Sequence, residues 1–192
     1  MTLRFNKKPD FSTLRIVGSR VELVPISQRY KNAIFHEFTD EVTTYMVPIA
    51  PKLIEETEVF IENAIADMQL GTDVVCVVRR VHSHEFLGCC GLHGKRNPLG
   101  PEFGIWLKRS AQNQGLGRDV IRAMGVWGAR SLDLHQFIYP ADQANTPSCK
   151  LAESFGGEII EIAPTRRMNG EWLNTVFYRI PKDVFSLSKS EA

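Results

Sequence analysis

The feature that most constrains the fold of this chain is a glycine turn between a strand-like and a helix-like stretch. Residues 112–119 read QNQGLGRD; the apolar run EFGIWL precedes them and VIRAMGVWGA follows them. Glycines permit a tight turn and let a ligand come close to the backbone. A helix that begins at such a turn also presents unpaired N–H groups and a partial positive charge. The turn therefore predicts either a plain connection or a phosphate-binding loop.

Strand and helix patterns follow one another along the chain. Alternating and β-branched stretches predict strands at 20–27, 73–81, 86–94, 102–109, 135–141, 157–164 and 171–181. Apolar residues at helical spacing predict helices at 28–40, 53–69, 118–132 and 145–155. In the second and third helices the stripes expected to face the core are Phe60, Ala64, Ile65 and Met68, and Val120, Ile121, Met124 and Trp127.

The order of these elements predicts how the sheet is connected. The three strands between 73 and 109 form an antiparallel meander, and the last two strands form a hairpin. The helix after the glycine turn makes strands 102–109 and 135–141 parallel neighbours. Residues 41–52, which hold Pro48 and Pro51, are predicted to be a loop. The fold class is α/β or α+β with a mixed sheet.

Length and charge limit the class of protein. A chain of 192 residues suits one domain, which we place at 15–185, between a flexible arm at 1–14 and a flexible tail at 186–192. The net charge of +1 gives no reason to expect nucleic acid or a membrane as partner. The N-terminal stretch MTLRFNKKPDFS lacks the apolar core of a signal peptide, which predicts a cytoplasmic location.

The cysteines and histidines give no metal signal. None of the four cysteines has C-x-x-C spacing, so buried reduced thiols are expected. Cys89 and Cys90 are neighbours and should point to opposite faces of a strand. His82 and His84 lie in a predicted hairpin turn with no third ligand in sequence reach.

Three phosphate-binding motifs can be compared with the glycine turn. A Walker A loop requires G-x-x-x-x-G-K-[ST], which does not occur in the sequence. The dinucleotide fingerprint requires a third glycine where Val120 stands. The pattern that fits is Q-x-x-G-x-G, formed by Gln112, Gly115 and Gly117.

On these residues the chain resembles the GNAT N-acetyltransferase superfamily, whose pyrophosphate-binding signature is [RQ]-x-x-G-x-[GA]. The order of elements from about 20 to 180 also matches that fold. Within the superfamily the chain resembles the RimJ/RimL-like ribosomal-protein N-terminal acetyltransferases. The stretches that carry this resemblance are DEVTTYM, LIEETEVFIENA, EFGIWL, NTPSCKLAESFG and NGEWLNTVFYRI.

The resemblance implies an acyl-CoA N-acyltransferase fold of about seven strands and about four helices, with a parallel strand pair splayed at the cofactor. It implies acetyl-CoA (coenzyme A) as acyl donor, no metal, and direct attack by a primary amine in a ternary complex. Many relatives are dimers, so a homodimer is expected. The implied cofactor-binding residues are Leu107, Arg109, Gln112, Asn113, Gln114, Gly115, Leu116, Gly117, Arg118, Asn145 and Ser148.

Three positions are candidates for the chemistry. Glu102, where Rim-like proteins carry a glutamate, is the candidate base; the alternative is a solvated turn carboxylate after Pro101. The backbone N–H of Leu107 is the candidate donor to the developing oxyanion. The tyrosine that many members carry would fall at Ala152 and is absent, so Ser148 is the candidate partner of the sulfur. Alternatively, Ser148 serves only the first turn of its helix.

The loops 40–52 and 164–172 are expected to shape the acceptor site, with Tyr45, Met46, Trp106 and Trp172 as candidate lining residues. The acceptor is a protein N-terminus or a small-molecule amine. A polyamine, an amino sugar or an antibiotic is the alternative. Asn174 stands where the family often has an acidic residue. If the chain has thereby lost catalysis, the alternative function outside the enzymes is a non-catalytic regulator that binds acyl-CoA.

Overall fold

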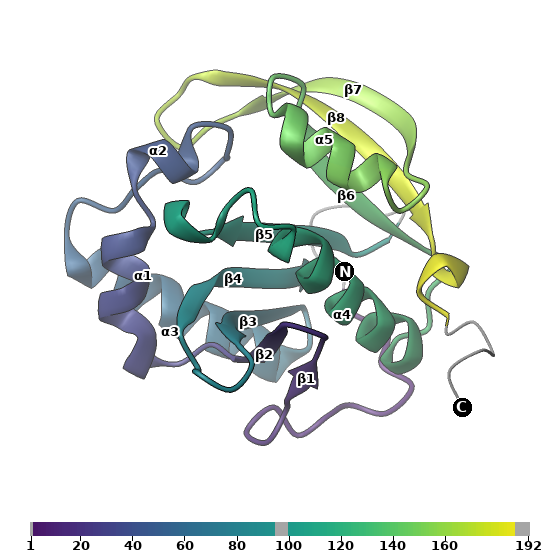
Figure 1. Cartoon of the computed structure of the whole chain (residues 1–192), viewed down its shortest axis with the longest axis horizontal. Coiled ribbons are helices and arrows are strands. Elements are labelled where there is room, and N and C mark those ends of the chain that lie inside the picture. The colour runs from purple at the N-terminus through teal and green to yellow at the C-terminus, as the bar shows by residue number, and fades with distance from the viewer. Residues whose placement is uncertain (1, 95–99, 187–192) are drawn as a thin grey trace.

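The computed structural model, which describes residues 2–94 and 100–186, holds one mixed sheet with helices on both faces (Figure 1). The strand order is β1-β2-β3-β4-β5-β6-β8-β7. The strands are β1 (Ile16–Val17), β2 (Val21–Pro25), β3 (Asp73–Arg80), β4 (Phe86–His93), β5 (Glu102–Leu107), β6 (Gln136–Asp142), β7 (Glu158–Arg166) and β8 (Trp172–Pro181). The helices are α1 (Lys31–Glu37), α2 (Asp40–Thr43), α3 (Ile54–Leu70), α4 (Leu116–Ser131) and α5 (Thr146–Glu153). The predicted mixed sheet is confirmed.

One parallel contact interrupts the otherwise antiparallel sheet. Strands β5 and β6 run parallel, as predicted, and their register holds a single pair, Glu102 with Ile138. Beyond it the two strands diverge (Figure 1). The Ile138 N–H donates to the Pro101 carbonyl, so the next donor of β6 toward β5 would come from position 140. Residue 140 is proline, which has no N–H to give. The parallel pairing therefore ends where the sequence removes a donor.

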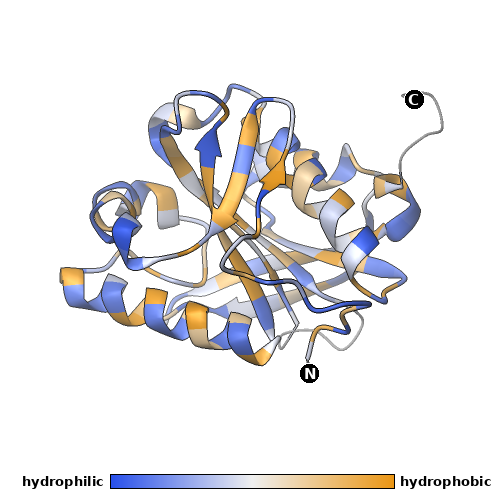
Figure 2. Cartoon of the chain, turned by 90° about the horizontal axis from the view of Figure 1, so that it is seen from below, coloured by the Kyte–Doolittle hydropathy of each residue, from blue (hydrophilic) through white to orange (hydrophobic). Residues whose placement is uncertain are grey.

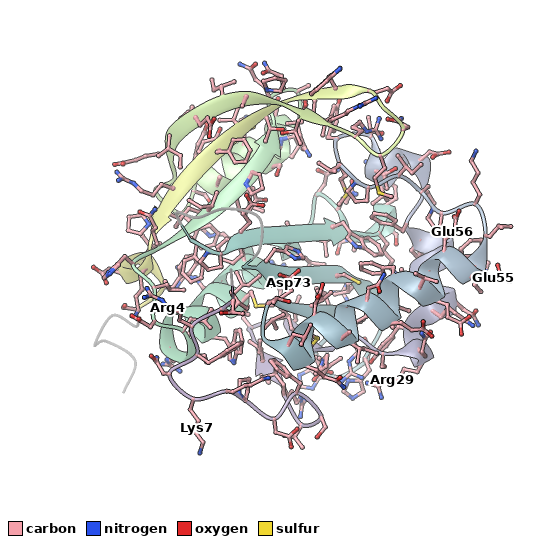
Figure 3. All side chains as sticks on the ribbon, turned by 180° about the vertical axis from the view of Figure 1, so that it is seen from behind. Arg4, Lys7, Arg29, Glu55, Glu56 and Asp73 are labelled. Carbon is pink, nitrogen blue, oxygen red and sulfur yellow. The ribbon has the colours of Figure 1, made fainter. Side chains whose placement is uncertain are left out.

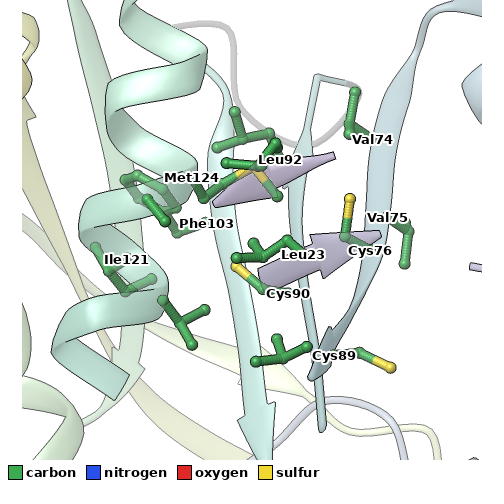
Figure 4. Close-up of a cluster of buried hydrophobic side chains, with 14 of the residues drawn as sticks. Leu23, Val74, Val75, Cys76, Cys89, Cys90, Leu92, Phe103, Ile121 and Met124 are labelled. Atoms are coloured by element: carbon green, nitrogen blue, oxygen red, sulfur yellow. The ribbon is translucent and has the colours of Figure 1, made fainter. Parts of the chain in front are cut away.

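Helices α3 and α4 cover opposite faces of the sheet (Figures 1 and 3). Ile121 and Met124 of α4 point at Leu92 and Phe103, and all four are buried (Figure 4). Apolar segments gather along the strands in the middle of the sheet (Figure 2). Cys89 and Cys90 point to opposite sides of β4, as predicted (Figure 4). Cys76 of β3 is also buried, and its burial raises the pKa of its thiol to about 12. All four cysteines are free thiols.

The structure corrects four details of the prediction. Within the described residues there are eight strands and five α-helices, because β1 has only two residues and α2 only four, too short for a periodic signal. The start of the predicted loop 41–52 belongs to α2, where the Thr39 side chain accepts the Val42 N–H. In α3 the buried stripe contains Ile61, whereas Phe60 is 44% exposed. Trp127 of α4 is half-buried rather than fully enclosed.

The expected N-terminal arm lies along the domain. The Leu3 N–H donates to the Gly71 carbonyl at 2.9 Å, and Leu3 is buried. Phe5 forms a bridge with Leu132. The predicted tail falls almost entirely outside the described residues, as does most of the turn predicted at 95–101. No helix in the described part of the chain is long and apolar enough to cross a bilayer.

A buried carboxylate ties β1, β2 and β3 together. Glu22 is fully buried and pairs with Arg15 at 2.7 Å, with Arg79 at 2.9 Å and with His84. Burial opposes ionisation, but the hydrogen bonds from His84 and Arg15 and the charge of Arg79 outweigh it, so the pKa of Glu22 is lowered. Removal of this carboxylate would leave the Arg79 guanidinium, which is 17% exposed, without its partner.

The substitution Glu22→Gln is expected to lower the free energy of unfolding by roughly 3 kcal/mol at pH 7. In a domain of this size that loss lowers the melting temperature by about 6–12 °C, which thermal denaturation would measure. Ionised Glu22 contributes stability above the unfolded-state pKa of about 4.3, and this contribution is lost as the pH falls through the lower folded-state pKa. The difference between variant and wild type should therefore shrink in acid.

Glu158→Gln is the matched control, because Glu158 is 65% exposed and pairs with Arg179, which is 45% exposed. Its loss should cost no more than about 1 kcal/mol. Equal melting temperatures for the two variants at pH 7 would contradict a stabilising role for the Glu22 cluster.

Candidate active site

The glycine turn forms the N-terminal end of α4. Gly115 is the N-cap residue and has φ 72°, a left-handed conformation that glycine adopts without strain. Asn113 has φ 59°, so the chain reverses twice within three residues. A Cβ at Gly117 would come no closer than 3.4 Å to Leu151, an ordinary contact. The first N–H groups of α4 are therefore exposed at the start of the helix, where the N-cap position requires a residue that can adopt a positive φ.

The cations at this turn differ from those expected. Arg20, at the start of β2, donates to the Gln114 carbonyl at 3.0 Å and pairs with Asp119 at 2.5 Å. Its guanidinium lies 3.2 Å from where a Cβ of Gly115 would stand. Arg118 instead turns toward the end of α5, where it donates to the Ser154 carbonyl at 3.3 Å. Arg20 was missed because it is distant in sequence, and no local motif marks it.

Gln112 connects the turn to the end of β5. Its Nε2 donates to the Leu107 carbonyl at 2.9 Å, and its Oε1 accepts from Arg109 at 3.0 Å. Arg109 also pairs with Glu41 of α2 at 2.8 Å. Both residues were predicted to bind the cofactor. In the structure their side chains hold the turn against β5 and α2.

The edge of β5 that faces the diverging strand β6 presents backbone donors. The Lys108 N–H donates to the Leu87 carbonyl of β4 at 2.8 Å. Alternation along a strand then directs the N–H groups of Leu107 and Ile105 away from β4, toward β6. Because β6 pairs with β5 only at Ile138, these donors face the gap between the two strands. An extended arm with amide groups could bond there as an added strand.

A pair of hydroxyl groups lies on the β6 side of the gap. The Asn145 side chain caps α5 by accepting the Ser148 N–H at 3.3 Å. The Ser148 Oγ lies 3.1 Å from the hydroxyl of Tyr139, a buried residue of β6. Burial raises the pKa of Tyr139 well above its usual value, so its hydroxyl stays protonated and can orient Ser148. A tyrosine thus stands near Ser148, although Ala152 holds the position where one was sought.

A cavity of 590 Å³ lies on the face of the sheet that α3 covers. Apolar side chains form most of its wall, among them Phe38, Phe60 and Trp106. Of the four predicted lining residues, Met46 and Trp106 border it. Tyr45 and Trp172 are 42% and 64% exposed and are not among the residues that border this cavity.

The turn between β7 and β8 closes one side of the cavity. Arg167 donates to the backbone carbonyls of Met46 and Thr43, both at 3.0 Å, and pairs with Glu171. The Met168 N–H donates to the Val47 carbonyl at 3.0 Å, and the Met168 side chain borders the cavity. The structure uses the Arg167 guanidinium to fasten the hairpin turn to the α2 segment.

Glu102 and His93 are partners in the register of β4 and β5. Glu102 is buried at 6% exposure and, by strand alternation, shares the cavity-side face of β5 with Gly104 and Trp106. His93 borders the cavity, and Glu102 is not among the bordering residues. Since Glu102 and Leu107 are five positions apart, about 17 Å of strand separates them.

Residues 20–158 match the acetyltransferase (GNAT) domain family. The match spans most of the chain, and the chain belongs to this family. It is therefore an N-acetyltransferase by family and fold, and GNAT acetyltransferases use acetyl-CoA. No curated protein sequence matches the chain.

Solved structures with the same fold include two bacterial enzymes of stated activity. One is the Salmonella typhimurium acetyltransferase that modifies the N-terminal serine of ribosomal protein L7/L12: TM-score 0.75, 17% identity, covering 88% of this chain and 99% of that one. Another is the Vibrio cholerae spermidine N-acetyltransferase with CoA and spermine: TM-score 0.73, 16% identity, covering 86% and 98%. A Bacillus anthracis GNAT acetyltransferase has a TM-score of 0.74 and 18% identity, and the match covers 88% of this chain and 99% of that chain. The family match confirms the predicted superfamily, and these neighbours share its fold.

Gly115→Ala is expected to weaken CoA binding about fivefold or more. A left-handed alanine costs about 1–2 kcal/mol, and the free turn can relieve this strain by leaving the conformation that presents its N–H groups, whereas the ligand-bound turn cannot. Calorimetric titration with CoA measures the change. Gly156→Ala is the control: Gly156 has φ 69° at the end of α5 and nothing within 4 Å of an added Cβ. It should carry similar backbone strain and leave the CoA affinity unchanged. Wild-type affinity in Gly115→Ala would argue against a ligand at this turn.

Proposed function

We propose that this chain transfers the acetyl group of acetyl-CoA to a primary amine bound in the cavity under α3. The observation that carries the proposal is the gap between β5 and β6. The backbone amides of the α4 turn lie near one end of this gap. Along the gap, β5 carries Ile105 and Trp106, which border the cavity. A donor held along the gap and an acceptor held in the cavity would therefore meet at β5. This arrangement supports direct attack in a ternary complex.

The residues present fit the acyl donor. The first N–H groups of α4 and the Arg20 guanidinium form a cationic end for the diphosphate. The N–H groups of Ile105 and Leu107 would bond to the amide groups of the arm and to the thioester carbonyl. Ser148, oriented by Tyr139, would donate to the sulfur. When bound, acetyl-CoA supplies an activated acyl group on a tolerable leaving group. We propose this role for each of these residues.

The composition of the cavity favours an acceptor whose amine is carried by an apolar or weakly polar body. Among the described residues Glu56 is the carboxylate that borders the cavity, and its Oε2 already accepts the backbone N–H groups of Lys52 at 2.6 Å and Leu53 at 3.3 Å. A polyamine would need several carboxylates to replace its hydration, and an amino sugar would need many hydrogen-bond partners. A protein N-terminus or an apolar small amine fits better.

Other predicted features stay predictions. Glu102, at the start of β5, stays a predicted base that rests on its sequence position, because it is not among the residues that border the cavity. The cytoplasmic location and the homodimer likewise stand on sequence alone. An experiment distinguishes the non-catalytic regulator from the enzyme. If the wild-type protein binds acetyl-CoA but none of the amines in a broad panel causes it to release thiol, the protein is a sensor rather than an enzyme. Among substrates, the cavity predicts a higher kcat/KM for apolar amines than for spermidine or glucosamine.

Gly117→Glu is expected to weaken CoA binding more than tenfold relative to Gly117→Gln, a difference of about 1.4 kcal/mol. The two side chains have nearly the same size, and a Cβ at this position meets only Leu151 at 3.4 Å, so both variants should fold. The glutamate places a negative charge at the proposed diphosphate site. Calorimetry measures the affinities, and thiol release measures turnover. Equal affinities for the two variants would remove the diphosphate from this turn.

A further inference from the structure

A histidine held by a carboxylate lies on the floor of the acceptor cavity. The Nδ1 of His93 on β4 is 2.9 Å from the Oδ2 of Asp73 on β3. Both side chains are largely buried, at 16% and 13% exposure. Asp73, at the start of β3, lies near the C-terminal end of α3, whereas Glu55 and Glu56 lie in the first turn of that helix (Figure 3). This pair was not singled out from the sequence, because its members are twenty residues apart and belong to different strands.

The geometry points to His93 as the base that takes the proton of the acceptor amine. We infer that His93 is a catalytic residue and that Asp73 is the positioning residue behind it. This inference rests on the proposed function and names a group that serves the same reaction. Three features support it: the fixed tautomer of the ring, the space made for the ring, and its place beside the gap between β5 and β6.

Asp73 determines which nitrogen of His93 faces the cavity side. One carboxylate oxygen, Oδ1, accepts the Gly94 N–H at 3.1 Å, and the other accepts from His93 Nδ1. The carboxylate is thus held on two sides by the backbone and by the ring. A hydrogen on Nδ1 leaves the lone pair of a neutral imidazole on Nε2. The ring is held in the tautomer that can accept a proton at Nε2.

Two glycines make the space that the ring occupies. Gly91 and Gly104 are register partners on β4 and β5. An added Cβ at Gly104 would stand 2.6 Å from the His93 Nε2, and one at Gly91 would stand 3.2 Å from it. A side chain at position 104 would therefore collide with the ring. The imidazole lies over a bare part of the sheet, and its Nε2 reaches across to β5.

The position over Gly104 brings Nε2 close to the proposed reaction centre. Gly104 directly precedes Ile105, whose N–H faces the gap, and it lies three residues before Leu107. Along a strand that separation is about 10 Å, against about 17 Å for Glu102. His93 and Gly104 both border the cavity. An amine in the cavity can reach His93 directly or through one water.

The proton step balances with the groups present. The lone pair of the amine nitrogen forms a bond to the acyl carbon, and the carbon–sulfur bond breaks with its electron pair on sulfur. The proton lost by nitrogen goes to the Nε2 of His93, and the resulting imidazolium is stabilised by the Asp73 carboxylate. Ser148 would donate a hydrogen bond to the thiolate, which then takes its proton from the imidazolium or from solvent. No oxidant, metal or further reactant enters the step.

The charged groups around His93 come from several elements. Asp73 contacts it from β3, and Glu102 is its register partner on β5. Glu56 of α3 and Lys52 before it border the same cavity. Of these charged groups in the described residues, Asp73 is the one that contacts the His93 ring. The substitutions Asp73→Asn and Glu102→Gln therefore separate the two carboxylates nearest to the histidine.

The test compares His93→Asn, Asp73→Asn and Glu102→Gln with the wild type, at saturating acetyl-CoA and with the best amine of the panel. Asparagine keeps a donor near the Nδ1 position for Asp73 and removes Nε2. His93→Asn should lower kcat about 100-fold or more at pH 7.5, with a nearly unchanged KM for the amine and CoA affinity. An amine of pKa about 8 is about one-quarter neutral at pH 7.5 and almost fully neutral at pH 9.5, so the defect should shrink about fourfold.

Asp73→Asn should show a smaller loss of kcat with the same recovery at high pH, which a purely structural role would not produce. His84→Asn is the control, because His84 also contacts a carboxylate, that of Glu22, but does not border the cavity. Its kcat should match that of the wild type. If His93→Asn fails to bind CoA and is therefore misfolded, Asp73→Asn carries the test.

Two results would overturn the inference: a kcat for His93→Asn that matches the wild type, or a loss that is the same at both pH values. If Glu102→Gln alone loses turnover, the base is Glu102 and the acetyltransferase proposal stands. If the wild type binds CoA but acetylates no amine, the proposed function fails and the catalytic role of His93 fails with it.

Discussion

The structure depends on the early end of the parallel pairing between β5 and β6. A continuous ladder would satisfy the N–H groups of Ile105 and Leu107 inside the sheet. Pro140 removes the donor that the next pair would need, and β6 turns away to pair with β8. The sheet is thereby opened at its middle rather than at its edge. Backbone donors that are normally consumed by the fold become available to a ligand.

This opening brings together two sites built by different parts of the chain. On the α4 side, the turn around Gly115 is fixed to β5 by Gln112 and to β2 by Arg20. On the α3 side, the cavity is closed by the hairpin turn, which Arg167 fastens to the α2 segment. In the proposed reaction, donor and acceptor would therefore approach β5 from opposite faces. The two partners can be held without competition for one surface, as a direct transfer requires.

The site could be predicted from sequence where its residues are neighbours along the chain. The glycine turn, the Asn145 cap and the parallel crossover follow from local rules of backbone geometry. Phe60 was predicted to face the core, and this prediction is wrong. Helical spacing identifies an apolar stripe on a helix, but it does not identify which other element packs against that stripe. Tyr45 and Trp172 were chosen as large side chains in suitable loops, and in the structure both are exposed. The position of a loop residue depends on contacts that its own sequence does not encode.

The sequence by itself determined the order of most strands and helices, the glycine turn before α4 and the family resemblance, because periodicity, glycine and proline act through local backbone energies. Only the tertiary structure decided which distant side chains meet. Arg20 at the turn, Tyr139 behind Ser148, and His93 between Asp73 and Gly104 come from strands that the sheet aligns. Strand register sets these contacts, and register arises from the packing of the whole sheet rather than from any one segment.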